Sequence, residues 1–226
     1  ALELWPENEE IKMLRAEAAR KLKIAELMKA AQDALAGSDP DEAVRLLKEA
    51  LALDPDNKVL QEAELLAEKK LQAAALKAKG LQQMAALEFP AAAATFDAAM
   101  QLDPDDEELP ELKALAETRA KAVDLANQAQ HEFDHGNNDK AFDMFDQALG
   151  LYPDSAEIKA LRDACQAELE RRLAELIAKI AALHAKGIED MAAEDFAGCV
   201  TDCETAIALD KDRVYPAEGR AEIEAM

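Results

Sequence analysis

The sequence predicts an all-α fold, a solenoid of stacked helical hairpins in which a long first helix alternates with a short second helix. Three observations support this prediction. The 226 residues include only 7 Gly and 8 Pro and few aromatic side chains, while Ala, Leu, Glu and Lys, which favour helices, are abundant. One short segment recurs every 49 residues. Between these segments the apolar residues return at steps of three and four, as they do on one face of a helix.

The recurring segment defines the repeat. A-L-E-L-W-P-E-N at the start of the chain returns as A-L-A-L-D-P-D-N, A-M-Q-L-D-P-D-D and A-L-G-L-Y-P-D-S, with prolines 49 residues apart at Pro6, Pro55, Pro104 and Pro153. A weaker copy, A-I-A-L-D-K-D-R, has Lys211 in place of the proline, 58 residues further on, so the last unit carries nine extra residues. We therefore expect one repeat domain over residues 1–226, with units at about 6–54, 55–103, 104–152 and 153–210.

Each unit is predicted to hold a helix of ~30 residues, a tight turn and a helix of ~15 residues. The long helix of the last unit shows one apolar stripe: Ile158, Leu161, Cys165, Leu169, Leu173, Leu176, Ile180 and Leu183. Turns are marked in order by Gly37-Ser38-Asp39-Pro40, Glu88-Phe89-Pro90 and Gly136-Asn137-Asn138-Asp139. Asp39 before Pro40 is a favourable N-cap for the short helix that follows. Residues 1–8 and 216–226 fall within partial units, so we expect a stretch of a longer repeat protein.

The short helices resemble tetratricopeptide repeats. That family places a small residue, a large apolar residue, a small residue and a proline at fixed offsets, and here these positions hold Ala43, Leu47, Ala50, Pro55; Ala92, Phe96, Ala99, Pro104; Ala141, Phe145, Ala148, Pro153; and Cys199, Cys203, Ala206, Lys211. The family's helix-packing glycine is matched by Gly80 and Gly187 and replaced by Ala31 and Ala129. The family unit has 34 residues, so a unit of 49 has a first helix lengthened by about four turns.

The resemblance implies a function in protein binding, because ligand peptides of the family lie along a groove lined by the first helices. The matching positions are Met28, Gln32, Lys77, Leu81, Met84, Gln130, Phe133, His184, Ile188 and Met191. Three flexible methionines would suit an adaptable groove. Alternatively, the lengthened helices bury these residues against the next unit. The family's clamp for acidic peptide C-termini uses Lys and Asn, and only Lys77 remains, which disfavours that ligand.

Charge and composition narrow the partners. With 26 basic and 48 acidic side chains the net charge is 26 − 48 = −22, which repels nucleic acid and anionic lipid. No apolar run approaches the ~20 residues that span a bilayer. Three cysteines do not form a disulfide framework and no signal-peptide pattern is present, so we expect a cytoplasmic protein. The acidic surface favours a basic protein or peptide partner, or it serves solubility alone.

Motifs that could carry chemistry are weak. His131-Glu132-Phe133-Asp134-His135 matches the zinc-protease pattern H-E-x-x-H, but Gly136 ends the helix at once and no third ligand motif follows. Cys199 and Cys203 stand four apart, yet they occupy packing positions of the repeat, as does Cys165. The Asp-Pro-Asp segments lack the glycine and glutamate of a calcium loop. No phosphate-binding loop is found, so we expect no cofactor and no resident metal.

The sequence therefore predicts a non-enzymatic protein-binding scaffold. Two alternatives remain open. The repeats could act as a structural spacer or assemble into homo-oligomers through the apolar faces at their open ends. A zinc hydrolase built on His131, Glu132 and His135 is a more distant alternative.

Overall fold

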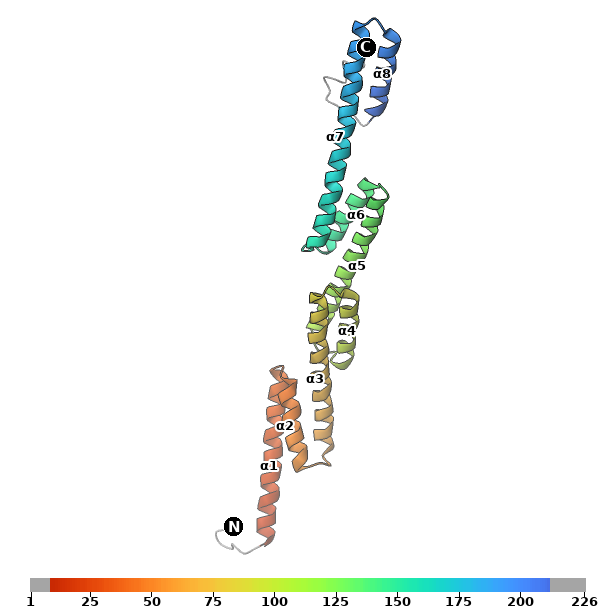
Figure 1. Ribbon diagram of the computed structural model, residues 1–226. Coiled ribbons are helices and arrows are strands. Elements are labelled where there is room, and N and C mark those ends of the chain that lie inside the picture. Colours follow the sequence, from red (N-terminus) through yellow and green to blue (C-terminus); the bar gives the residue numbers. More distant parts are fainter. Residues whose placement is uncertain (1–8, 212–226) are drawn as a thin grey trace. The chain divides into compact units, whose positions relative to one another are not determined.

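A computed structural model describes residues 9–211, and all the regular structure in this range is helical (Figure 1). Long and short helices alternate: α1 (Glu9–Ala36), α2 (Pro40–Leu53), α3 (Lys58–Ala85), α4 (Phe89–Leu102), α5 (Glu108–Asp134), α6 (Asn138–Leu151), α7 (Ala156–Ala192) and α8 (Phe196–Leu209). The predicted all-α class is confirmed. The partial units predicted at residues 1–8 and 216–226 lie outside the described residues.

The chain divides into two compact units, Ala1–Ala120 and Lys121–Met226. The sequence predicts one repeat domain, and the division falls inside α5. In unit 1, α1 packs on α2, α2 on α3 and α3 on α4. In unit 2, α6 packs on α7 and α7 on α8. Each helix in these pairs is therefore packed against a neighbour in the sequence.

Side-chain caps fix several helix starts. The predicted N-cap Asp39 accepts a hydrogen bond from the Glu42 amide at 3.1 Å. After the repeat prolines Pro55 and Pro153, a polar side chain caps the next long helix. Asn57 accepts from two amides at the start of α3, and Ser155 accepts from the Ile158 amide at 3.2 Å at the start of α7. These side chains satisfy amides that the helix cannot pair itself.

The four turns between long and short helices share one geometry. Each contains one residue with positive φ, namely Ser38, Leu87, Gly136 and Glu194. In each turn the next residue donates its amide to a carbonyl five residues back, as Asp39 does to Ala34 at 2.9 Å. This is the Schellman arrangement, which ends a helix and reverses the chain. The repeat therefore extends to the backbone conformation of its turns.

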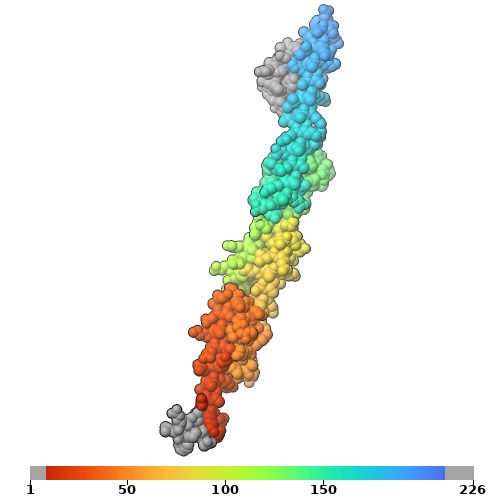
Figure 2. Space-filling view, turned by 60° about the vertical axis from the view of Figure 1, so that its left-hand side comes forward, coloured from red at the N-terminus to blue at the C-terminus, as the bar shows by residue number. Residues whose placement is uncertain are grey.

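Three helical segments build each complete core. In unit 1 the first core contains the C-terminal half of α1, all of α2 and the N-terminal half of α3, with buried residues Ile24, Leu27, Ala31, Ala43, Val44, Leu47, Ala50, Leu60 and Ala67. Figure 2 shows the red α1 and orange α2 in contact. In unit 2 the corresponding core contains Ala122, Ala126 and Ala129 of α5, Ala141, Phe145 and Ala148 of α6, and Ile158 and Cys165 of α7. A long helix thus contributes its two halves to successive cores.

The nine extra residues of the last unit lie in α7, which has 37 residues where α3 has 28. In α3 the buried positions Leu60 and Gly80 are 20 residues apart, about 5.6 turns, and so face opposite sides. In α7 the equivalent Ile158 and Gly187 are 29 residues apart, about 8.1 turns, and share one side. Accordingly, α2 and α4 lie on opposite sides of α3, whereas α6 and α8 lie on the same side of α7 (Figure 1).

Candidate interaction surface

The predicted groove residues of unit 1 divide between core and surface. Met28 packs against the first core, and Met84 is buried on α3. Gln32 and Leu81 are exposed. Lys77 is half-buried and forms ion pairs with Asp106 at 2.9 Å and Glu108 at 2.7 Å. Its ammonium group is therefore engaged within the unit.

The predicted groove residues of unit 2 divide in the same way. Phe133 packs against the core of α5, α6 and α7, and His184 is buried on α7. The amide of Gln130 donates to Asp134 at 2.7 Å. Ile188 and Met191 are exposed on α7. Of the predicted set, Met84 and His184 are therefore buried, and Met28 and Phe133 are partly buried.

The H-E-x-x-H motif lies at the C-terminal end of α5. The rings of His131 and His135 stack with centroids 4.1 Å apart. The Glu132 carboxylate accepts hydrogen bonds from Lys140 at 2.6 Å and Asn137 at 2.7 Å, which lower its pKa. Within the described residues, no group of three His, Cys, Asp or Glu side chains is arranged to hold a metal ion. Glu132 thus ties the end of α5 to the start of α6.

The cysteines occupy the predicted packing positions. Cys165, Cys199 and Cys203 are all buried and unbridged. The Cys165 thiol donates to the Asn138 carbonyl oxygen at 3.3 Å, which links α7 to α6. Burial raises the pKa of Cys165 and of Cys203, so both favour the neutral thiol.

An acidic pocket of about 510 Å³ lies in unit 1. It is formed where the α1–α2 turn, the middle of α3 and the α4–α5 loop meet, and we call it the acidic pocket. Its lining residues are Leu35, Ser38 and Pro40 from the turn region, Lys70, Ala74 and Lys77 from α3, Asp103, Asp105, Asp106 and Glu107 from the loop, and Glu108 from the start of α5. Five carboxylates against two ammonium groups leave the lining with a net charge of −3.

Three of the five carboxylates are paired inside the pocket. Lys70 binds Asp103 at 2.7 Å, and Lys77 binds both Asp106 and Glu108. Burial disfavours the charged form of Asp106, but hydrogen bonds from Lys77 and from the first amides of α5 outweigh it, so the pKa of Asp106 is lowered. The same balance raises the pKa of Lys77, because its hydrogen bonds to Asp106 and Glu108 outweigh burial. Lys77 and Asp106 therefore both favour their charged forms.

Two carboxylates of the acidic pocket remain available. Asp105 and Glu107 are exposed and have no ion-pair partner among residues 9–211. The predicted groove contains Lys77 but none of the carboxylates that surround it. The acidic run Asp103–Glu108 is visible in the sequence, yet its position opposite the α1–α2 turn follows only from how α2 and α4 are placed around α3.

Comparison with known proteins gives no relative: no protein-family model, curated protein or solved structure matches this chain. In the part of the chain that the structure describes, no helix combines the length and apolar character needed to cross a membrane.

Proposed function

We propose that this chain is a non-enzymatic scaffold, built of lengthened tetratricopeptide-like hairpins, that binds a basic segment of a partner protein at the acidic pocket. Support for the hairpin assignment comes from the small–large–small positions of the repeat, which are buried in all four short helices: Ala43, Leu47 and Ala50; Ala92, Phe96 and Ala99; Ala141, Phe145 and Ala148; Cys199, Cys203 and Ala206. Stacking of such hairpins into a solenoid is part of the proposal.

The binding proposal rests on two carboxylates that have no ion-pair partner among the described residues and that lie in a preformed recess. Asp105 and Glu107 stand beside Asp106 and Glu108, whose charges are held in place by Lys77. A lysine or arginine of a partner would gain charge-assisted hydrogen bonds there without displacing an internal ion pair. Leu35, Pro40 and Ala74 offer apolar contacts for the stem of that side chain.

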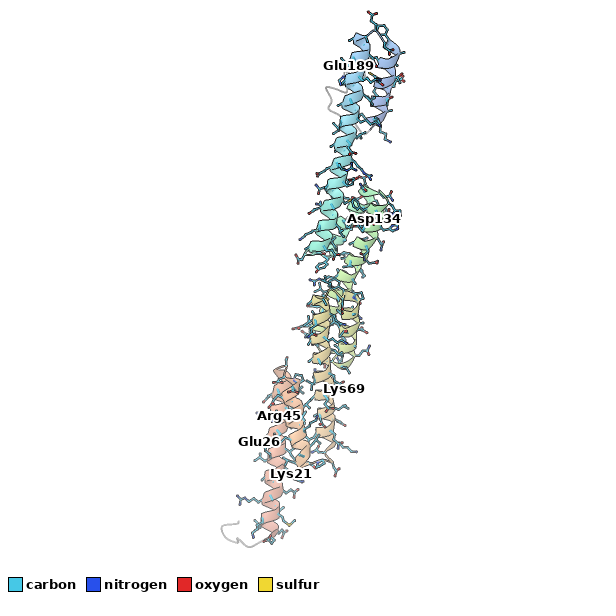
Figure 3. The ribbon with its side chains drawn as sticks, viewed as in Figure 1. Lys21, Glu26, Arg45, Lys69, Asp134 and Glu189 are labelled. Carbon is cyan, nitrogen blue, oxygen red and sulfur yellow. The ribbon has the colours of Figure 1, made fainter. Side chains whose placement is uncertain are left out.

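The net charge of the whole chain suits the same partner. A protein with a charge of −22 attracts basic segments over a distance of about 8–10 Å at physiological salt, and this attraction accelerates encounter more than it adds affinity. Charged side chains project from helices of both units, as Glu26, Lys69 and Asp134 illustrate (Figure 3). The pocket is proposed to give this general attraction a specific location.

The test uses a short lysine-rich peptide as the probe and a glutamine-substituted peptide of the same length as its control. Binding is measured by fluorescence anisotropy for the unmodified chain and for the double variant Asp105→Asn, Glu107→Gln. Loss of two direct charge contacts is expected to weaken binding about tenfold or more, because each hydrogen bond to a charged group contributes roughly 1.5–3 kcal/mol. The internal pairs of Lys70 and Lys77 are left intact.

A matched control separates the effect of position from the effect of total charge. The double variant Glu26→Gln, Asp143→Asn also removes two charges, from exposed positions on α1 and α6 that do not line the pocket. We expect it to retain the affinity of the unmodified chain within about twofold. Equal weakening by both double variants would mean that the peptide responds to net charge alone, and the pocket would lose its proposed role.

A further inference from the structure

The N-terminal half of each long helix requires a covering short helix. In α3, Leu60 and Ala67 are buried in one core with α2. In α7, Ile158 and Cys165 are buried in the same way with α6. Leu109 and Ala116 of α5, at the equivalent positions, are also buried. The repeat therefore defines one standard interface between a short helix and the next long helix.

Helix α1 presents this interface uncovered. Leu14, Ala18 and Leu22 stand 49 residues before Ala63, Ala67 and Leu71 of the first core. Leu14 is 60% and Leu22 62% exposed, and Ala18 is exposed, whereas Ala67 is fully buried. In Figure 1, α2 lies beside the C-terminal part of α1, and the N-terminal part of α1 extends beyond it.

Helix α8 presents the opposite half of the same interface. Val200 and Ile207 are 47% and 43% exposed. The equivalent residues of α2 are Val44, which is buried, and Leu51, which packs against the core shared with α3. The inner face of α8, formed by Cys199, Cys203 and Ala206, is already packed on α7. The exposed face of α8 is therefore equivalent to the face with which α2 packs on the following long helix, α3.

From these two faces we infer that the chain binds a second copy of itself head to tail, with α8 of one copy covering the N-terminal half of α1 of the next. The contact would rebuild the three-segment core found at α1, α2 and α3. Its surfaces share no residue with the acidic pocket, so this inference and the proposed function stand independently. Two copies would share a heterologous interface, which can propagate into longer assemblies or close into a ring.

Charge complementarity favours a second copy as the occupant. Residues 9–23 of α1 hold five basic and three acidic side chains, a net charge of +2 in a chain whose total is −22. Residues 196–209 of α8 hold no basic side chain. Of their two acidic residues, Asp202 is buried and paired with Lys186, and Glu204 is exposed. The net positive N-terminal half of α1 would therefore face a surface of α8 whose exposed charge is acidic.

The repeat also predicts one particular ion pair. At two internal interfaces the short helix carries an aspartate that pairs with a basic residue of the next long helix: Lys113 with Asp97, and Arg162 with Asp146 at 3.0 Å. Lys113 and Arg162 stand nine residues after the repeat proline, and the two aspartates stand seven residues before it.

At the two ends of the array these same positions hold Arg15 on α1 and Glu204 on α8. Among the residues that the structure describes, neither one has an ion-pair partner. The polarity is the same as in the two internal pairs, with the basic group on the long helix. Docking of α8 on α1 of a second copy would bring Glu204 and Arg15 together.

Association is measured by sedimentation velocity over a range of protein concentrations at low salt. We expect concentration-dependent growth for the unmodified chain. Ala18→Glu and Val200→Glu each place a charge at the centre of one face, and each is expected to weaken association at least ~10-fold, since burying an unpaired charge is strongly unfavourable. Both positions are exposed within one copy, so circular dichroism should show unchanged helicity.

A matched control places the same charge at a repeat position that is exposed on every long helix. Ala160→Glu on α7 corresponds to the exposed residues Met13, Glu62 and Glu111, and it should leave association unchanged. Mixing the two single variants gives a sharper result. The Ala18→Glu variant retains an intact α8 face, and the Val200→Glu variant retains an intact α1 face. One copy of each should therefore associate through these two faces. The resulting dimer should grow no further, because its two remaining faces both carry the substituted glutamate.

The charge pair provides a second readout. Arg15→Glu and Glu204→Arg should each weaken association about fivefold, and the double variant Arg15→Glu, Glu204→Arg should recover it. A chain that stays monomeric at all concentrations, as it would if its own terminal segments covered these faces, overturns the inference. Association that Ala18→Glu and Val200→Glu leave intact, or a mixture of the two that does not dimerise, also overturns it.

Discussion

Gly80 allows α3 and α4 to approach closely because the ring of Phe96 occupies the space that a side chain at this position would need. Gly80→Ala is expected to destabilise the protein by about 1–2 kcal/mol, since overpacking costs roughly 1–3 kcal/mol and the better helix propensity of alanine returns up to ~1 kcal/mol. Urea denaturation followed by circular dichroism measures the change.

Gly150 is the matched control for Gly80, because no atom lies within 4 Å of a methyl group built at this position of α6. Gly150→Ala should stabilise the protein by about 0.5–1 kcal/mol through helix propensity alone. A stabilising Gly80→Ala substitution would contradict the close packing of Gly80 on Phe96.

The Lys77–Asp106 pair makes a prediction about pH. The pKa of Asp106 is lowered in the folded state, so the pair contributes stability above the unfolded value near 3.8, and this contribution is lost as the pH falls through the lower folded pKa. Asp106→Asn keeps an acceptor for the Glu108 amide and removes the charge. It should cost about 1 kcal/mol at pH 7.

The cost of Asp106→Asn should shrink as the pH falls below about 3.8, because the Asp106 carboxyl of the unmodified chain is then protonated first in the unfolded state and, at still lower pH, in the folded state. Urea denaturation at neutral and acidic pH measures both differences. A cost that stays constant across the two conditions would show that the charge of Asp106 is not what stabilises the pocket.

Individual residues differ in how far the sequence determines their role. The repeat correctly assigns Cys165, Cys199 and Cys203 to buried positions, because each replaces a packing residue of the other units. The repeat alone does not distinguish groove from core for Met84 and His184, which are buried. The two halves of a long helix pack against different neighbours, so which of its apolar residues are covered depends on where those neighbours lie.

At the scale of the element, substitution of the α3 N-cap tests directly whether side-chain caps fix the helix boundaries. Asn57 accepts hydrogen bonds from the amides of Val59 and Leu60 at 3.2 and 3.3 Å. Asn57→Ala should cost about 1 kcal/mol, the usual value for loss of an N-cap. Glu88 precedes α4 but makes no side-chain cap bond, so Glu88→Ala should cost less than about 0.5 kcal/mol. Thermal unfolding of both variants measures the difference.

The helices themselves follow closely from the 49-residue period. The turns after Ala36, Ala85 and Asp134 fall at the predicted breakers, and all four short helices have 14 residues, near the ~15 expected. The different placement of α8 on α7 follows from the nine extra residues and the pitch of a helix. The acidic pocket could not be predicted in this way, because it joins the α1–α2 turn to a loop more than 60 residues later.

At the scale of the whole molecule, charge and packing have separate roles. The cores of both units are formed almost wholly by apolar side chains, so nearly all the charged side chains among residues 9–211 are at least partly exposed. If this charge serves binding, association with a basic partner should slow steeply from low to physiological salt, since exposed charges are then screened within about 8–10 Å. An association rate that does not change with salt would mean that the negative charge serves solubility and not binding.

The most direct test of the central claim is to map the lysine-rich probe peptide on the chain by amide chemical shifts. Binding at the acidic pocket predicts that the largest changes cluster at Leu35–Pro40, at Lys70–Lys77 and at Asp103–Glu108, and that they disappear in the Asp105→Asn, Glu107→Gln variant. Changes spread evenly over the acidic surfaces of both units, and retained in that variant, would contradict the proposed function.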